Sequence, residues 1–284
     1  MNRRVDFTQP AGEPALIAAD SVSWVVFKNP VATFIGGITA VILELAEPRV
    51  RAGVWDHTTF RTDPRTRLRR TGLAAMVSVY GPRSVAEAMI AGVTRAHDRV
   101  SGVATNGEAY RANQRELLDW VQATASFGFL EAYRAYVGPL SDADADRFYA
   151  ESHATARLYG ATGAPTSVAM LEAQFEAMRP RLEASPIVDE FLDIMGRAEV
   201  LPRVLRPLQR LFVRAAVAIT PAWALAQLGL DASRWRLAGW ERRLVRGLGR
   251  MAERVLLKRS PAVQACQRLG LSADHLYERP LLRL

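Results

Sequence analysis

Apolar positions recur every three or four residues along most of this 284-residue chain, with polar and charged side chains on the opposite faces. This spacing is the period of amphipathic α-helices. No run alternates apolar and polar residues over the length of a strand, and the Asn106-Gly107 pair falls between helical segments. The pattern therefore predicts an all-α fold without a β-hairpin.

Proline, glycine and capping residues divide the pattern into roughly ten helices. Asp63 followed by Pro64 predicts an N-cap and first turn, and Ser84 with Glu87 predicts a capping box. No linker, repeat or low-complexity tract interrupts the chain, so we expect one domain over 1–284. The predicted helical segments are 29–48, 63–81, 84–102, 111–138, 142–160, 165–178 and 185–195, with two or three more in the arginine-rich end.

The glycine pair Gly36-Gly37 lies inside the first apolar helical segment. A glycine loop that binds phosphate would instead follow a strand and precede a helix. We therefore expect this pair to allow close packing between helices.

Lys and Arg outnumber Asp and Glu by 37 to 29, which gives a formal net charge of +8. An excess of this size suits an anionic partner such as nucleic acid, a membrane surface or an acidic cofactor. No nucleic-acid-binding motif occurs, and aromatic residues do not interleave with the basic ones, so we expect no nucleic-acid partner. The basic residues are most frequent between Arg203 and Arg259. The basic C-terminal third is a candidate for peripheral membrane contact, with 231–284 forming a helical extension packed on the core.

The chain has a single cysteine, Cys266, which excludes an internal disulfide and cysteine-rich metal sites. We expect it to be a small buried hydrophobe. The most apolar stretches, 31–48 and 211–230, carry charges such as Glu44 and Arg214, so they predict buried helices and not membrane spans. Polar residues interrupt the N-terminal segment, which predicts no secretory signal and a cytoplasmic protein.

His97 lies on the apolar face of a predicted helix and should point toward the core. One hypothesis is a core histidine that is hydrogen-bonded to a backbone carbonyl. The other is an axial metal or haem ligand, because neutral imidazole on an apolar wall is a usual ligand of haem iron. Residue spacing alone leaves both open. The face consists of Ala86, Met89, Ile90, Val93, His97 and Val100.

Arg67, Arg70 and Thr71 stand at positions i, i+3 and i+4 and share one side of the preceding helix. They form either a solvated basic face or a polar patch that lines a cavity and pairs with carboxylates of a ligand or cofactor. Gln122 interrupts an apolar row that includes Phe129, so its amide must be satisfied locally or lie at a cavity.

Five segments follow one another in an order and at separations that resemble the MpaB-type oxygenase family, which includes the latex-clearing proteins, or rubber oxygenases. The resemblance covers about residues 20 to 230. It implies an all-helical fold with a globin-like core that holds haem b and uses dioxygen to cleave carbon–carbon double bonds. The segments are "LELAEPRVRAGVWDHTTF", "DPRTRLRRTG", "GVTRAHDRVSG", "YRANQRELLDWVQAT" and "FLEAYRAYVGPLSDADADRFYAE".

The resemblance also implies roles for individual residues. His97 looks like the proximal ligand of the haem iron. We add Gln122 and Tyr110 as candidate cofactor-binding residues, although Tyr110 could instead cap and pack the loop before its helix. Arg67, Arg70 and Thr71 occupy the place of the distal Arg, Lys and Thr of the latex-clearing proteins.

Three positions depart from the family pattern. Arg70 replaces the lysine, and a guanidinium stays protonated and cannot ligate iron. We therefore expect Arg70 to polarise bound oxygen or to pair with a haem propionate. Glu47 and Gln122 stand where relatives often have histidine.

These observations support a haem b-dependent oxygenase that acts on an unsaturated apolar substrate such as a terpenoid or lipid. Apolar helix residues such as Phe129 would line the substrate space. A non-catalytic haem- or lipid-binding protein of the same fold is the alternative that the replaced histidines favour. A purely structural helical protein is a third hypothesis.

Overall fold

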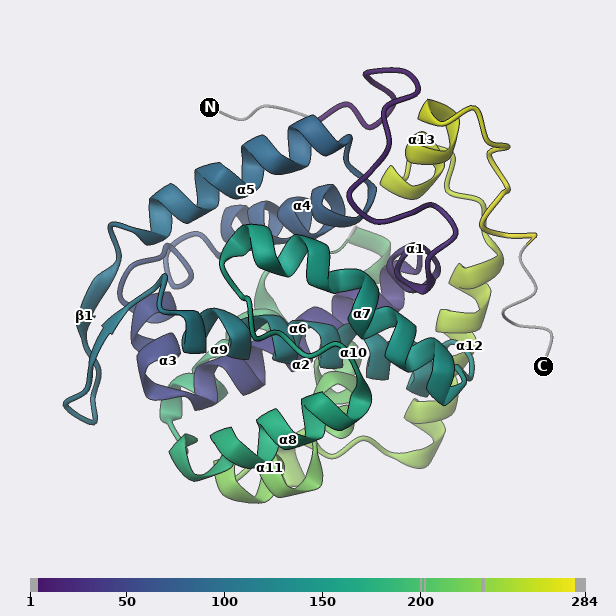
Figure 1. Ribbon diagram of the computed structural model, residues 1–284. Coiled ribbons are helices and arrows are strands. Elements are labelled where there is room, and N and C mark those ends of the chain that lie inside the picture. The colour runs from purple at the N-terminus through teal and green to yellow at the C-terminus, as the bar shows by residue number, and fades with distance from the viewer. Residues whose placement is uncertain (1–4, 200, 202, 231–232, 279–284) are drawn as a thin grey trace.

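The computed structural model describes residues 5–199, 201, 203–230 and 233–278. These residues form thirteen α-helices, three short 3-10 helices and two short strands (Figure 1), which confirms the all-α class. The helices are more numerous than predicted because Val22–Phe27 and Pro48–Trp55 are additional helices, and the arginine-rich end contains four instead of two or three. The elements are α1 Val22–Phe27, α2 Pro30–Ala46, α3 Pro48–Trp55, α4 Pro64–Tyr80, α5 Arg83–His97, β1 Ser101–Val103, β2 Ala109–Arg111, α6 Arg115–Tyr136, α7 Asp142–Tyr159, α8 Val168–Met178, η1 Arg179–Arg181, α9 Pro186–Arg197, η2 Arg203–Leu205, α10 Arg206–Ile219, α11 Ala222–Leu228, η3 Ser233–Trp235, α12 Gly239–Arg254 and α13 Pro261–Arg268.

Helices α2 and α6 form the central pair of the fold (Figure 1). They approach so closely at Gly36 and Gly128 that a Cβ on Gly36 would lie 2.6 Å from the Gly128 carbonyl oxygen. Only glycine fits where two helix backbones meet at this distance. Gly36 therefore has the packing role predicted for the glycine pair.

The main hydrophobic core surrounds α2, α6 and α10, and two of its buried aromatic side chains donate hydrogen bonds to backbone carbonyls. The Trp120 indole nitrogen donates to the Leu43 carbonyl at 3.2 Å. The Tyr136 hydroxyl donates to the Ala215 carbonyl at 2.8 Å. These bonds avoid the penalty of an unsatisfied buried donor and fix how α6 sits on its two neighbours.

A second core joins the two ends of the described chain. Cys266 on α13 is buried in it, as predicted for a small hydrophobe. Beside it, the buried Arg268 guanidinium donates to the carbonyls of Glu13, Phe7 and Tyr80 at 2.7 to 2.8 Å. Three carbonyls from different segments therefore hold the C-terminal helix against α4 and the N-terminal segment.

The predicted absence of a hairpin is wrong. Strands β1 and β2 pair antiparallel with Gly102 opposite Tyr110, and the turn between them contains Gly107 with a φ of +84° (Figure 1). A Cβ on Gly102 would lie 2.9 Å from the Tyr110 hydroxyl. Gly102 therefore accommodates a cross-strand ring and does not end a helix, which stops at His97.

The predicted capping box of α5 is also absent. The helix begins at Arg83, its N-cap is Pro82, and no side chain caps it. The Ser84 amide and hydroxyl instead bond to Glu13 of the N-terminal segment at 2.6 and 3.1 Å. Ser84 therefore bonds to a distant segment and does not form the predicted capping box with Glu87.

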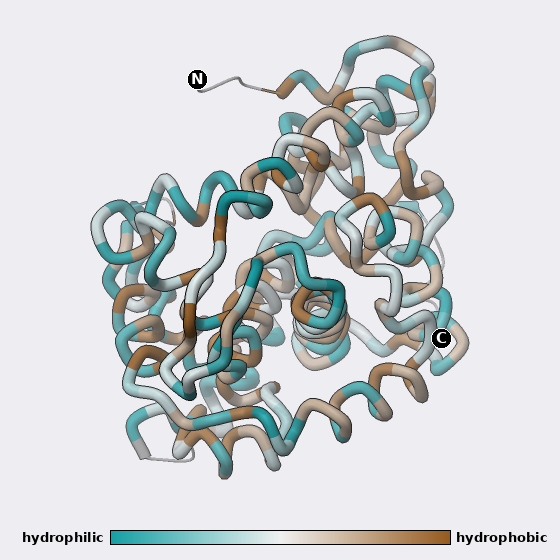
Figure 2. Tube along the Cα trace, turned by 60° about the vertical axis from the view of Figure 1, so that its left-hand side comes forward, coloured by the Kyte–Doolittle hydropathy of each residue, from teal (hydrophilic) through white to brown (hydrophobic). Residues whose placement is uncertain are grey.

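Hydrophobic and hydrophilic residues are interspersed along the helices, as expected for amphipathic helices (Figure 2). In the part of the chain that the structure describes, no single helix is long and apolar enough to span a membrane. The two most apolar stretches are each broken by a bend, of 114° between α2 and α3 and of 108° between Arg203–Ile219 and α11.

Candidate functional site

Stripes of partly exposed residues run along three helices that are otherwise well packed. On α2, the central helix, these residues are spaced three or four apart and so share one face. The α2 and α6 stripes meet, because a Cβ on Gly37 would lie 3.9 Å from the Phe129 ring. The neighbouring helices therefore do not fully close over these faces. The stripes are Phe34, Gly37, Val41 and Glu44 on α2, Met89, Val93 and His97 on α5, and Gln122, Ala125 and Phe129 on α6.

Three ionisable side chains from α2, α4 and α5 lie at this place, and we call Glu44, Arg67 and His97 the inner polar cluster. Their charges act on one another, since Arg67 lowers the pKa of Glu44 and also that of His97. The cluster joins residues 53 positions apart in the chain, from 44 to 97. Two of its three members, Arg67 and His97, are site residues that the sequence predicted.

The Glu44 carboxyl has a pKa raised to about 7, because burial disfavours its charged form more than the nearby Arg67 favours it. The side chain is largely enclosed by protein, but it keeps some accessible surface because it lies on the partly exposed stripe of α2. A carboxyl of this kind can hold or release a proton near neutral pH. Sequence reasoning did not select Glu44; the available signal was a lone carboxylate on the stripe of an apolar helix.

The Arg67 guanidinium is held inside the site by Thr71. Its Nη1 donates to the Thr71 hydroxyl, which in turn donates to the Arg67 carbonyl at 3.1 Å. Its Nε is buried and lacks a hydrogen-bond partner among the described residues. Burial also lowers the pKa of Arg67, against the opposite effect of Glu44. A buried donor without a partner is costly and marks a position where a ligand acceptor would stabilise the protein.

His97 is partly buried at the end of α5, on the face that the sequence predicted. Ala86 and Ile90 of the same face are fully buried, whereas His97 keeps accessible surface. Burial and the positive charge of Arg67 lower its pKa, so the imidazole is neutral at pH 7. The ring forms no hydrogen bond with the described residues. The backbone carbonyl partner expected for a purely structural core histidine is therefore absent.

Arg70 and Thr71 differ in how they relate to the cluster. Thr71 bonds to Arg67, as expected for residues one turn apart. Arg70 is exposed, and its charge lowers the pKa of Arg67. The structure thus brings together Arg67, Thr71 and His97 and leaves the distal role of Arg70 as a prediction.

Gln122 and Tyr110 each have a hydrogen-bond partner among the described side chains. The Gln122 amide donates to the Ser126 hydroxyl at 3.2 Å within α6, next to the stripe. The buried Tyr110 hydroxyl lies 3.1 Å from Nε2 of His57, and its ring covers Gly102 in the hairpin. Both contacts are structural, and a cofactor-binding role for either residue stays a prediction.

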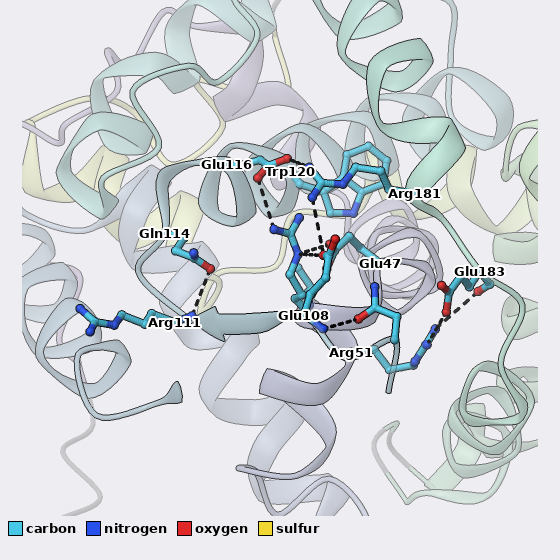
Figure 3. A network of polar contacts seen from close by, with 12 residues as sticks. Glu47, Arg51, Glu108, Arg111, Gln114, Glu116, Trp120, Arg181 and Glu183 are labelled. Atoms are coloured by element: carbon cyan, nitrogen blue, oxygen red, sulfur yellow. Dashed lines mark hydrogen bonds and ion pairs between the residues drawn. The ribbon is translucent and has the colours of Figure 1, made fainter. Parts of the chain in front are cut away.

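Glu47, one of the three departures from the expected family pattern, is fully buried in an ion-pair network (Figure 3). It accepts from the Val50 amide at 2.7 Å, which caps α3, and from Arg49 Nε at 2.6 Å. Arg49 also reaches Glu108 at 3.3 Å and Glu116 at 3.4 Å. The network ties α3 to the hairpin and α6, so Glu47 has a structural use in this chain.

No group of three or more His, Cys, Asp and Glu side chains that could hold a metal ion occurs among the described residues. A haem iron needs only an axial protein ligand, since the porphyrin supplies the other nitrogens. The inner polar cluster contains one histidine, which suits that kind of attachment.

Comparison with known families gives one match over most of the chain. The family model described as "ER-bound oxygenase mpaB/B'/Rubber oxygenase, catalytic domain" matches residues 24–254. The match includes the whole inner polar cluster and extends through α12, beyond the range suggested by the sequence motifs.

Two curated relatives are uncharacterized proteins of mycobacteria, Mb2261 of Mycobacterium bovis and Rv2237 of Mycobacterium tuberculosis. Each is 32% identical over 116 residues, which cover 39% of this chain and 46% of the relative. The match therefore spans less than half of each relative. No solved structure matches the chain.

Proposed function

The chain belongs to the family of MpaB and rubber oxygenase catalytic domains, and from this premise we propose that it is a haem b-dependent oxygenase with His97 as the iron ligand. The substrate class we propose is an apolar molecule with a carbon–carbon double bond. The inner polar cluster is the observation that carries this proposal, because it places one neutral imidazole beside one unsatisfied cationic donor.

The residues present fit a haem. His97 would hold the iron, since its imidazole is neutral and free of other hydrogen bonds in the described chain. The unpartnered Arg67 Nε would donate to an anionic oxygen of the bound group. When bound, haem supplies the redox chemistry that lets dioxygen react with an alkene. Cleavage of a C=C bond by dioxygen balances without a reductant, because the two oxygen atoms enter the two carbonyl products.

The chain's own polar residues would orient groups and hold a proton. Glu44 can carry a proton or a charge near neutral pH, so it is suited to accept a proton at its carboxylate oxygen. Thr71 fixes the rotamer of Arg67 through a hydrogen bond. Arg70 stays protonated and cannot take over a lysine's place as a neutral nitrogen ligand.

Apolar side chains of the stripes would bind the substrate. Phe129 lies 4.6 Å from Phe27, measured between ring centroids, and keeps accessible surface on the stripe of α6. Phe34 and Val41 on α2 are likewise partly exposed. An apolar wall beside a few polar groups is the usual composition of a small-molecule site.

The second candidate is a haem- or lipid-binding protein of this fold without oxygenase activity. It is favoured by Glu47 and Gln122, which replace histidines of relatives and have structural partners. Both candidates predict that the inner polar cluster binds a ligand. They differ in whether the protein then oxidises a substrate with dioxygen.

The test is the visible spectrum of the purified protein after addition of haem. We expect a Soret band that is lost in His97→Ala and retained in His57→Ala, a matched change at an exposed histidine. A protein that stays colourless, or a band that both variants retain equally, contradicts His97 as the ligand. Oxygen consumption with unsaturated terpenoids or fatty acids then separates the oxygenase from the binding protein.

A further inference from the structure

The exposed side of α12 combines large apolar residues with arginines. Trp240, Leu244 and Met251 are 66%, 41% and 57% exposed and fall on one stripe of the helix. Soluble surfaces rarely leave large apolar side chains aligned in this way without a partner. Arginines line one edge of the stripe, at positions 243, 250 and 254.

The opposite side of α12 is fixed to the core by buried carboxylates. Glu253 pairs with Lys28 at 2.7 Å and accepts from Asn29 at 2.9 Å and from the Tyr133 hydroxyl at 3.0 Å. Glu241 caps the first turn through the Ala238 amide at 2.9 Å. The helix therefore cannot rotate to bury its apolar stripe, and α12 itself lies at the edge of the molecule (Figure 1).

The arginines beside the stripe are free to meet an outside partner. Arg243, Arg250 and Arg254 are exposed and have no ion pair with any residue that the structure describes. By contrast, Arg246 bonds the Ala135 carbonyl at 2.9 Å, on the side of α6. Both acids of α12 are buried, so its exposed surface carries positive charge alone.

Exposed apolar and basic residues also follow the end of the helix. Val255 and Leu257 are 46% and 41% exposed, and Lys258 and Arg259 beside them are also exposed. The apolar stripe and its basic border thus extend over the last turn and the following segment. We call this surface, from Trp240 to Arg259, the α12 face.

We propose that the α12 face docks the protein on membranes that contain anionic phospholipids. Interfacial helices place Trp and Leu side chains at the boundary between headgroups and acyl chains while arginines contact lipid phosphates. The α12 face has both components side by side, on a helix already fixed in orientation. This inference does not depend on haem binding, because it concerns a different surface and a different ligand.

A lipid surface explains the observations better than two other partners. Nucleic acid would be bound by the arginines, but an exposed row of Trp240, Leu244 and Met251 would gain nothing from phosphate contacts. A second copy of this chain would bring two like-charged faces together, which costs free energy at an isologous interface. Both partners are outcomes of the test.

The test is co-sedimentation of the full chain with vesicles of phosphatidylcholine, with and without phosphatidylglycerol. We expect binding only to the anionic vesicles and weaker binding at high salt. The triple variant Arg243→Gln, Arg250→Gln, Arg254→Gln should lower the partition coefficient about fivefold per arginine and about a hundredfold in all. Trp240→Ser should also weaken binding.

Matched variants separate the α12 face from net charge. Arg83, Arg157 and Arg210 are exposed and lack ion pairs among the described residues, so changing these three to Gln removes the same charge elsewhere. This control variant should bind as the unmodified protein does. Leu158→Ser, at an exposed leucine of α7, is the control for Trp240→Ser. The melting temperature of each variant is compared with that of the unmodified protein, so that loss of binding is not confused with loss of the fold.

Several results would overturn the proposal. They are equal binding to neutral vesicles, no binding of the unmodified protein to anionic vesicles, or equal loss of binding in the two triple variants. A molecular mass that doubles with concentration and reverts in Trp240→Ser would show that a second copy covers the face. Displacement from vesicles by RNA, with tight RNA binding lost in the first triple variant, would favour nucleic acid.

Discussion

Replacing Glu44 with glutamine tests whether the inner polar cluster has the electrostatics that the structure gives it. The carboxyl has a pKa of about 7 in the folded protein and 4.5 as its ordinary value. Because the folded pKa is the higher one, the folded state prefers protonated Glu44. Its ionisation therefore destabilises the fold progressively as pH rises from 4.5 to about 7.

The size of the effect follows from the shift. Each pKa unit corresponds to about 1.4 kcal/mol, so the full shift would be about 3 kcal/mol. The side chain keeps some accessible surface, and solvent screening reduces the expected penalty to about 2 kcal/mol. The glutamine side chain has no charge to bury, so Glu44→Gln should gain about 2 kcal/mol of unfolding free energy over the original chain across this pH window.

The assay is guanidinium chloride unfolding of the ligand-free protein at pH values on both sides of the window. Glu172→Gln, at an exposed carboxylate of α8, is the control and should show no such pH dependence. A stability difference between Glu44→Gln and the original chain that stays constant with pH would refute the reasoning. It would mean that Glu44 ionises as a solvated carboxyl does.

Two further pairs of variants test the packing around the site. Gly36→Ala should destabilise the protein by about 1–3 kcal/mol in denaturant unfolding, because its Cβ would meet the backbone of α6 at 2.6 Å, whereas Gly37→Ala has room and should be neutral or stabilising. Equal effects would contradict the close approach of the two helices. Glu47→Ala should cost about 2–3 kcal/mol, because it removes a helix cap and leaves buried Arg49 with weaker partners. Glu183→Ala removes a half-exposed ion pair with Arg51 and should cost under about 1 kcal/mol in the same assay; a larger loss here than in Glu47→Ala would be inconsistent with the network.

Sequence pattern predicted those parts of the fold that depend on neighbouring residues. The N-terminus of α4 is an example: Asp63 accepts from the Thr66 amide at 3.1 Å, and Pro64 follows in the first turn, as expected. The capping box of α5 was predicted wrongly because the Ser84 amide donates to Glu13, 71 residues away. A single sequence contains no direct signal for such a contact.

The hairpin escaped detection for a different reason. Its strands have three residues each, too few to show alternation, although Tyr110 is buried between exposed Ala109 and Arg111. The Asn106-Gly107 pair was the available signal, since it favours a tight turn. Here the turn residues were more informative than the period of the flanking segments.

The candidate site was predictable where it lies on one helix face and not where it joins helices. His97 and Arg67 were selected from their own helices, and the effect of the Arg67 charge on the pKa of His97 places them near each other. Glu44 was interpreted only as a charge that argues against a membrane span. Its role depends on α4 lying near α2, which the spacing within α2 cannot reveal.

The charge balance of the site bears on the arginine at position 70. Arg67 is enclosed with a single carboxyl, Glu44, to compensate it, and the charge of Arg70 already disfavours the charged form of Arg67. Enclosing a second guanidinium would place two permanent cations beside one acid whose own pKa is about 7. A lysine at position 70 could lose its proton and enter as a neutral amine, whereas an arginine cannot. The exposure of Arg70 follows from this difference, and it leaves the inner polar cluster with one cation, one titrating acid and one neutral imidazole.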